Sequence, residues 1–319
     1  MAMAAGKATE FDAEENSKGK TENTPLLGEK SEGKSVGLKL SGLSDFGPIK
    51  FFLELQEHFG YKLLALLFIV QHNLKGLSSA YFGRAQPYLL KSYHVPGPQM
   101  QIVSGIVKLP WALKPIIGLV SDVMPIGGYN KAPYMLVVSV LGALSCILIG
   151  VLPQEMLSIT TIIVFGFFFN LQVSTCDLLS EAKYAEKMQR SPTKGSSLLT
   201  YVWFGMNVAG FVATITSGTL IHQMGPKVLF VVAAVPAAFA IYPVMMGYME
   251  ETKLTPEELA ENRARYLQQK EACGLCVLML ISSIAVMVCG LISRDPVINC
   301  VVAVAVGMAM LVCFSLVLS

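Results

Sequence analysis

The sequence predicts an all-α membrane protein that crosses the bilayer several times. Of its 319 residues, 53% are hydrophobic and only 14% are charged, whereas soluble domains usually carry about 25% charged residues. The charges are clustered, so long apolar stretches lie between them. The net charge of +2 and the lack of a base-reading motif exclude nucleic acid as an expected partner. The expected environment is the lipid bilayer.

Eight segments match the length of a membrane-spanning helix, which needs about 20 mostly apolar residues. The first begins near Tyr61, too late in the chain for a cleaved signal peptide. The first two segments are the least hydrophobic, but polar residues inside a helix bundle are expected where helices face the interior or a water-filled cavity. The predicted segments are 62–83, 98–121, 133–152, 157–179, 196–221, 226–248, 272–293 and 297–319.

The first 60 residues are predicted to be a disordered cytosolic tail, because they are polar and poor in aromatic residues. The tail ends in a short amphipathic segment, 46–60, that we expect to lie on the membrane surface. Glu22, Leu26 and Leu27 match an acidic dileucine signal, E-x-x-x-L-L. Such a signal would direct the protein to endosomal or vacuolar membranes. If the match is fortuitous, the tail carries no sorting signal, and the plasma membrane is the alternative location.

Basic residues concentrate in two loops, 180–195 and 249–271. The positive-inside rule places these loops and the N-terminus in the cytosol, with Arg84 and Lys91 as exceptions on the opposite side. The loop 249–271 also predicts a linker helix, because Thr255, Pro256 and Glu258 suit the N-cap, N1 and N3 positions.

The stretch from Leu109 to Tyr134 carries the most specific pattern, P-W-x-x-K-P-x-x-G-x-x-S-D-x-x-P-x-x-G-Y-x-K-x-P-Y. Its G-x-x-S-D part resembles the loop between helices two and three of major-facilitator transporters. The full string resembles the folate–biopterin transporter family, with the similarity covering about 61–250. The resemblance implies a six-helix N-terminal bundle at 61–248, a cytosolic linker helix at 249–271, and two helices of an incomplete second half at 272–319.

The resemblance implies a proton-coupled symporter for folates or pterins that works by alternating access. Because the family architecture has two six-helix halves, we expect a truncated or alternatively spliced chain, unless the twelve-helix analogy fails. The rival hypothesis is a transport-inactive membrane protein that derives from or modulates a full-length transporter, with a homo-oligomer or a full-length paralogue as partner. A receptor with seven or eight helices is a weaker alternative.

Two lysines of the second segment are candidate substrate-binding residues, because a lysine at bilayer depth is costly without a functional reason or a partner. Lys108 lies deeper and suits an anionic substrate such as the glutamate tail of folate. Lys114 projects from another side of the helix. It either lines the same path, or reaches the membrane surface or an acidic partner.

The first and fourth segments add further candidates. Gln71 and Lys75 are four residues apart and share a helix face. The fourth segment has a polar stripe on one helix face, formed by Asn170, Ser174, Asp177 and Glu181. Asn170 is a candidate substrate-binding residue. Burial favours the neutral form of a carboxylic acid, so Asp177 is the candidate for proton coupling. The alternative is a structural salt bridge from Asp177 or Glu181 to a basic residue.

The fifth segment offers Tyr201, Trp203 and Asn207, which would stack on and hydrogen-bond a flat pterin ring, although membrane aromatics more often serve as packing or interface anchors. By resemblance, Asp122 would be a gating residue at the start of the cytosolic hairpin, with Lys131 at its end. The run of basic residues usual after the Gly-Tyr of the family is thinner here.

No constellation for hydrolysis, phosphate binding or metal binding is present in the sequence, so we expect neither an enzyme nor a cofactor. The four histidines are scattered, and the lone pair Cys273 and Cys276 lacks the second pair that a zinc site needs.

Overall fold

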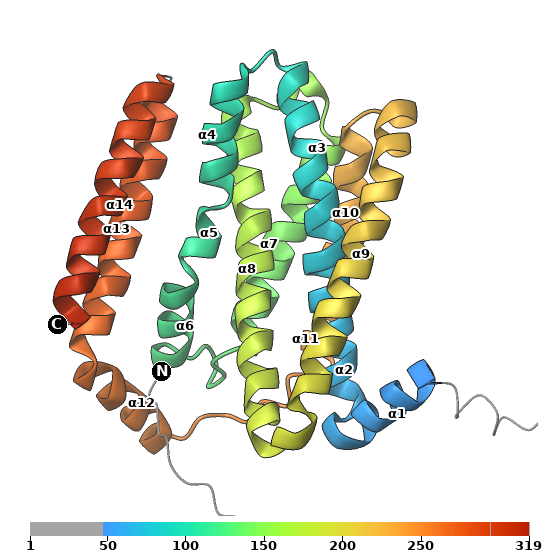
Figure 1. Cartoon of the computed structure of the whole chain (residues 1–319), viewed down its shortest axis with the longest axis vertical. Helices are drawn as coiled ribbons and strands as arrows, with labels where there is room; N and C mark the ends of the chain where they lie inside the picture. The colour runs from blue at the N-terminus through green and yellow to red at the C-terminus, as the bar shows by residue number, and fades with distance from the viewer. Residues whose placement is uncertain (1–46, 294, 319) are drawn as a thin grey trace, which may run out of the picture.

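The computed structural model describes residues 47–293 and 295–318. These residues are almost wholly helical, and the long helices stand side by side while two short ones, at 47–59 and 256–268, lie across one end (Figure 1). Residues 1–46 of the predicted tail, including its dileucine pattern, lie outside the described residues. The amphipathic segment is a helix, α1 (Gly47–Phe59), which buries Leu55 and Phe59.

Within the described residues, seven helical segments are long and apolar enough to cross a membrane. They coincide with seven of the eight predicted segments, which confirms the all-helical membrane fold. The helices that form them are α2 (Tyr61–Leu67) with η2 (Phe68–Ser78) and α3 (Ser79–Ser92), α7 (Ala132–Val151), α8 (Ile159–Arg190), α9 (Gly195–Met224), α10 (Lys227–Phe239) with α11 (Ile241–Met245), α13 (Lys270–Ile292) and α14 (Pro296–Leu318).

The remaining predicted segment, 98–121, is helical but interrupted twice. It consists of α4 (Gly97–Val107), α5 (Leu109–Ala112) and α6 (Lys114–Val123). Each interruption lies two residues before a proline, Pro110 or Pro115. Proline lacks the N–H of the helical hydrogen bond, and its ring clashes with the carbonyl four residues earlier. The expectation of one continuous helix is therefore wrong at these two points.

The first span contains an unusual widening, because η2 is a π-helix. Such turns are rare and often occur at functional sites. The span also continues past its predicted end at 83 to Ser92, with Pro87 inside α3. The fourth span likewise continues to Arg190, beyond the predicted 179, and begins where the Ser158 hydroxyl accepts a hydrogen bond from the Thr161 N–H.

One glycine of α9 allows a close contact between helices. A Cβ on Gly205 would lie 2.1 Å from the His72 ring of η2. No atom of the described residues lies within 4 Å of a Cβ on Gly218, and at Gly210 the contact would be an ordinary 3.7 Å. Of these three glycines, Gly205 is therefore the one that helix packing requires.

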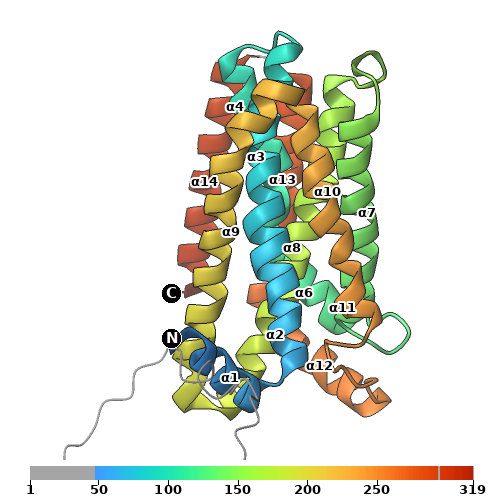
Figure 2. The same ribbon diagram turned by 90° about the vertical axis from the view of Figure 1, so that its right-hand side faces the viewer.

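The helices α13 and α14 form a hairpin that packs against α4, α5 and α6. Figures 1 and 2 place this hairpin on the opposite side of the bundle from α9 and α10. The linker helix α12 (Pro256–Gln268) leads into it, and its capping box, in which Thr255 and Glu258 exchange hydrogen bonds, confirms the predicted helix start. At the other end of the hairpin, Gly290 lies close to Ile106.

Candidate functional site

A buried carboxylate on α8 joins two lysines from other helices. The side chain of Asp177 is only 3% exposed. Its Oδ1 lies 2.8 Å from Nζ of Lys75 on η2, and its Oδ2 lies 2.5 Å from Nζ of Lys114 on α6. The acidic partner considered for Lys114 is thus Asp177, and the cluster links three helices at one point.

The π-helix η2 supplies a third group to this carboxylate. Gln71 donates from Nε2 to Asp177 Oδ1 at 2.8 Å and to the Ser180 hydroxyl at 3.0 Å. The predicted shared face of Gln71 and Lys75 is confirmed, because both contact the same oxygen. The Oε1 atom of Gln71 is buried and has no hydrogen-bond partner among the described residues.

Both tryptophans of the chain lie against these lysines. Nζ of Lys114 is 5.0 Å from the ring centroid of Trp111, and Nζ of Lys75 is 6.0 Å from Trp111 and 5.5 Å from Trp203. These distances fit cation–π contacts. Trp203 is 55% exposed, while Trp111 also donates to Asn170 Oδ1 at 3.2 Å. The cluster therefore combines cations, a carboxylate and open aromatic faces.

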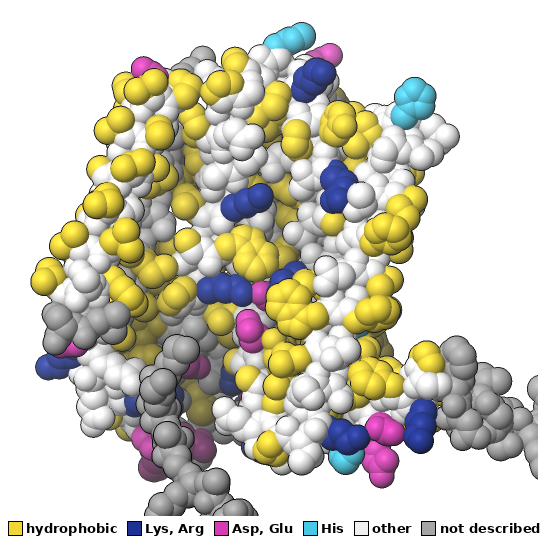
Figure 3. All heavy atoms as spheres, viewed as in Figure 1, with side chains coloured by type: hydrophobic (Ala, Val, Ile, Leu, Met, Phe, Trp, Pro, Cys, Tyr) yellow, Lys and Arg dark blue, Asp and Glu magenta, His cyan; other side chains and the backbone are white. Residues whose placement is uncertain are grey.

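The two positive charges of this cluster are balanced only when an exposed carboxylate is counted with the buried one. Two lysines surround one buried aspartate, and the second carboxylate, Glu181, is 3.9 Å from Lys114 and 53% exposed. Figure 3 shows basic and acidic side chains together near the middle of one face, among hydrophobic side chains, with further basic side chains above them. Lys114 thus faces one buried and one exposed carboxylate.

The structure brings Gln71, Lys75, Lys114, Asn170 and Asp177 together, whereas three other predicted residues form different contacts. Lys108 is exposed at the junction of α4 and α5, and no ion pair of its side chain occurs in the described part of the chain. The Tyr201 hydroxyl donates to the Leu64 carbonyl. Asn207 donates to the Trp203 carbonyl at 2.7 Å.

Trp111 is the site residue that sequence reasoning missed. It belongs to the P-W-x-x-K string three residues before Lys114, and that spacing was the available signal. Trp111 lies on the short helix α5, between the two helix interruptions. The mean hydropathy of the segment does not reveal these interruptions.

The predicted gating residues lie at the end of the bundle that holds α12. Asp122 on α6 accepts a 2.6 Å hydrogen bond from the Tyr266 hydroxyl on α12 and a weaker one from Asn130. Burial, together with this bond, raises the pKa of Tyr266 to about 12, so the phenol remains a donor at neutral pH. Lys131 contributes its backbone N–H, which donates to Glu251.

Glu251 caps the N-terminus of α7 from 120 residues away. Its Oε1 accepts from the N–H groups of Asn130 and Lys131, and its Oε2 accepts from Ala132, each at 2.9 Å. A carboxylate at this helix end satisfies otherwise unpaired donors and matches the helix dipole. The segment after α11 is thereby fastened to the hairpin between α6 and α7.

Comparison with known proteins supplies the family. The BT1 family matches residues 75–318, which extends well past the limit of 250 inferred from the sequence. The chain is 30% identical over 149 residues to Folate transporter 1 of Plasmodium falciparum, covering 46% of this chain and 29% of that protein. It is 26% identical over 211 residues to Probable folate-biopterin transporter 4 of Arabidopsis thaliana, covering 65% and 42%.

A third relative is the Folate-biopterin transporter of Synechocystis sp., 28% identical over 218 residues that make up 64% of this chain and 42% of that protein. The chain thus spans less than half the length of these curated relatives. The family match covers most of the chain, and it agrees with the helical bundle and with the motif at 109–134. The chain is a multi-pass integral membrane protein that belongs to the BT1 family of folate–biopterin transporters.

Proposed function

We propose that this protein transports folate- or pterin-type metabolites by proton-coupled symport. The observation that carries the proposal is the lysine–aspartate cluster, in which Lys75 and Lys114 hold Asp177 beside two tryptophan rings. Ionisable residues inside a membrane bundle are costly, so their presence favours a role in substrate or ion passage.

The chemistry of folate matches this cluster. A carboxylate of the glutamate tail would take the place of Asp177 beside Lys75 and Lys114, because both are carboxylates that pair with ammonium groups. The p-aminobenzoyl ring next to this tail, or the ring of a free pterin, would lie against Trp111 or Trp203, since offset stacking of aromatic rings is favourable. Gln71, whose Oε1 has no partner in the described residues, would accept a hydrogen bond from the amide N–H of the tail or from an amino group of the free pterin.

Competition for the lysines gives a route to proton coupling. When a substrate carboxylate displaces Asp177, the freed and buried carboxylate has lost its cationic partners. Protonation then becomes favourable, because burial penalises the charged form. One substrate and one proton would therefore enter the site together, and loss of the proton would return Asp177 to the lysines and expel the substrate.

Alternating access requires the bundle to rock against a second bundle around this site. We place the N-terminus in the cytosol, with Asp122 and Lys131 at the cytosolic gate, because the basic loops gather at that end. Another copy of the chain or a full-length paralogue is the partner that we propose for this movement.

The test is uptake of labelled folate by cells that express this chain, at acidic and neutral pH, with membrane insertion confirmed and a full-length relative as positive control. We expect acid-stimulated uptake that is lost in Lys75→Gln and retained in Arg190→Gln, whose exposed side chain pairs only with Glu186 among the described residues. Inserted protein that shows no uptake beside an active control would contradict the proposal. Reduced uptake by a co-expressed full-length relative would then support the transport-inactive modulator.

A further inference from the structure

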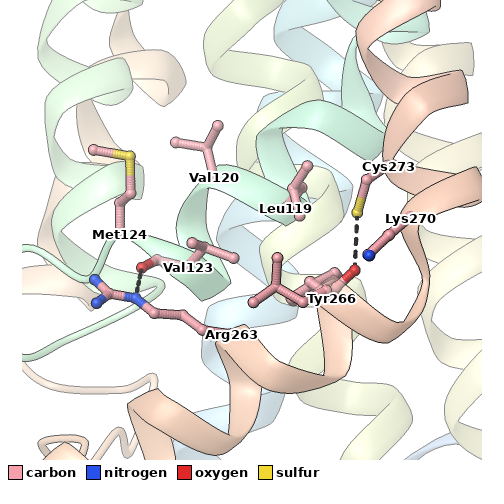
Figure 4. A pocket seen from close by; sticks show the side chains of 9 residues that line it. Leu119, Val120, Val123, Met124, Arg263, Tyr266, Lys270 and Cys273 are labelled. Carbon is pink, nitrogen blue, oxygen red and sulfur yellow. Dashed lines mark hydrogen bonds between the residues drawn. The ribbon is translucent and has the colours of Figure 1, made fainter.

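A pocket outside the transport cluster lies where α6, α12 and α13 meet. It encloses about 580 Å³, and its walls are mostly apolar side chains (Figure 4). The helix α6 contributes Leu119, Val120 and Val123, while α12 contributes Leu267. Walls of this kind suit a hydrocarbon chain.

Two cations stand at the edge of the pocket, and neither has a carboxylate partner among the described residues. Arg263 uses its Nε to donate to the Val123 carbonyl at 3.2 Å, which leaves its terminal nitrogens available. The Lys270 ammonium group lines the pocket and forms no ion pair within the part of the chain that the structure describes. Figure 4 shows Arg263 and Lys270 on either side of Tyr266, along the edge formed by α12 and the start of α13.

The edge of the pocket is held in place by a contact already described. The Tyr266 hydroxyl donates to Asp122 on α6, so α12 is fixed against α6 and the pocket does not depend on a free helix. Along α12 the acidic residues occupy the first half, at 257, 258 and 261, and the basic residues follow at 263 and 265. The basic half leads directly into the membrane-spanning hairpin of α13 and α14.

We propose that this pocket binds an anionic phospholipid, with an acyl chain between the apolar walls and the phosphate beside Arg263 and Lys270. The position at the membrane end of α12 is where hydrocarbon gives way to headgroups. Basic residues at this level attract anionic lipids, and arginine pairs well with phosphate. A zwitterionic lipid fills the same walls without supplying a net negative charge to the two cations.

The experiment is native mass spectrometry of the purified chain after addition of phosphatidylglycerol or phosphatidylcholine with matched acyl chains. The wild-type protein should retain phosphatidylglycerol in preference to phosphatidylcholine. The double variant Arg263→Gln with Lys270→Gln should lower phosphatidylglycerol retention by roughly 10- to 30-fold, the effect of losing two interfacial basic residues.

Two control variants separate site binding from general charge and from misfolding. Arg265→Gln removes a neighbouring charge whose guanidinium contacts Asn262 and does not line the pocket, so it should keep the preference. The double variant Arg263→Lys with Lys270→Arg preserves both charges and should keep it too. Equal retention of both lipids by the wild type, an equal loss in Arg265→Gln, or a lipid-free dimer that covers the pocket would overturn the proposal.

Discussion

Lys114, the first residue of α6, lies 2.5 Å from Asp177 of α8. The pair fastens the segment that follows the second helix interruption to the longest helix of the bundle. It also fixes one side of the candidate site, since Lys75 holds the other oxygen of the same carboxylate. Removing a single partner from such a buried pair is usually far more damaging than replacing the whole pair.

Asp177→Asn should therefore destabilise the protein, because two lysines lose their counter-charge at once. We expect the free energy of unfolding to fall by about 3–5 kcal/mol, the range for broken buried ion pairs, as measured by detergent-denaturant titration. Glu181→Gln is the matched control, since its carboxylate is more exposed and 3.9 Å from Lys114. If the Asp177→Asn protein proved as stable as the Glu181→Gln protein, the ion pairs would not be what holds the bundle together.

Gly205→Ala should destabilise the contact between α9 and η2. The new Cβ would lie 2.1 Å from the His72 ring, and that ring is held by a 3.0 Å hydrogen bond to the Tyr201 carbonyl and by contact with Tyr201. Overpacking of this kind costs about 1–3 kcal/mol. Thermal unfolding checks the prediction against Gly218→Ala, which has space for the methyl group and should be neutral or slightly stabilising.

Glu251→Ala should loosen the start of α7, because three backbone N–H groups lose their acceptor. Hydrogen exchange at Asn130, Lys131 and Ala132 should become at least about tenfold faster, since hydrogen bonds to a charged group contribute about 1.5–3 kcal/mol each. Glu257→Ala, in the first turn of α12, is the control. Unchanged exchange at these three amides would mean that Glu251 is not their principal acceptor.

Glu250 should make stability depend on pH at the same end of the bundle. Its hydrogen bond and ion pair with Lys187 hold the pKa of its carboxyl below the ordinary value of 4.5. A group with a lowered pKa in the folded state stabilises the fold above its unfolded pKa, and this contribution disappears as pH falls through the folded value.

The melting temperature of Glu250→Gln should thus be below that of the wild type at neutral pH, and the difference should close at pH values below about 4.5. The side chain is 41% exposed, so the difference will be small. In a Lys187→Gln background the Glu250→Gln substitution should lose most of its effect. A difference that persists unchanged at acidic pH would exclude this ion pair as its cause.

Much of the helix bundle can be predicted because each membrane span is a local run of about 20 apolar residues. The pairing of Gln71 and Lys75 on one face follows from helical spacing alone, and a buried aspartate on α8 stands out in any apolar segment. The helix interruptions before Pro110 and Pro115 are not predicted, because hydropathy averaged over about 20 residues does not respond to a break of one residue in the helix. The cap by Glu251 joins residues about 120 positions apart, and no local pattern identifies such a partner.

The contacts of the candidate site follow from local sequence only in part. Lys108, Tyr201 and Asn207 were chosen by residue type and depth, but the direction of each side chain depends on the interruption at Lys108 and on packing against α2 and η2. Trp111 lies on α5, between the two interruptions, so its orientation does not follow from the spacing of one continuous helix.

The most direct test of the central claim is folate binding to the purified chain, followed by tryptophan fluorescence. Both tryptophans lie at the proposed site, so the intrinsic signal reports on it without a label. Free N-acetyltryptophanamide corrects for light absorbed by folate. We predict saturable quenching by folate and by a pterin, none by glutamate alone, and weaker folate affinity in Lys75→Gln and Lys114→Gln. Quenching that does not saturate, or a folate affinity that neither lysine substitution changes, would contradict a folate site at this cluster.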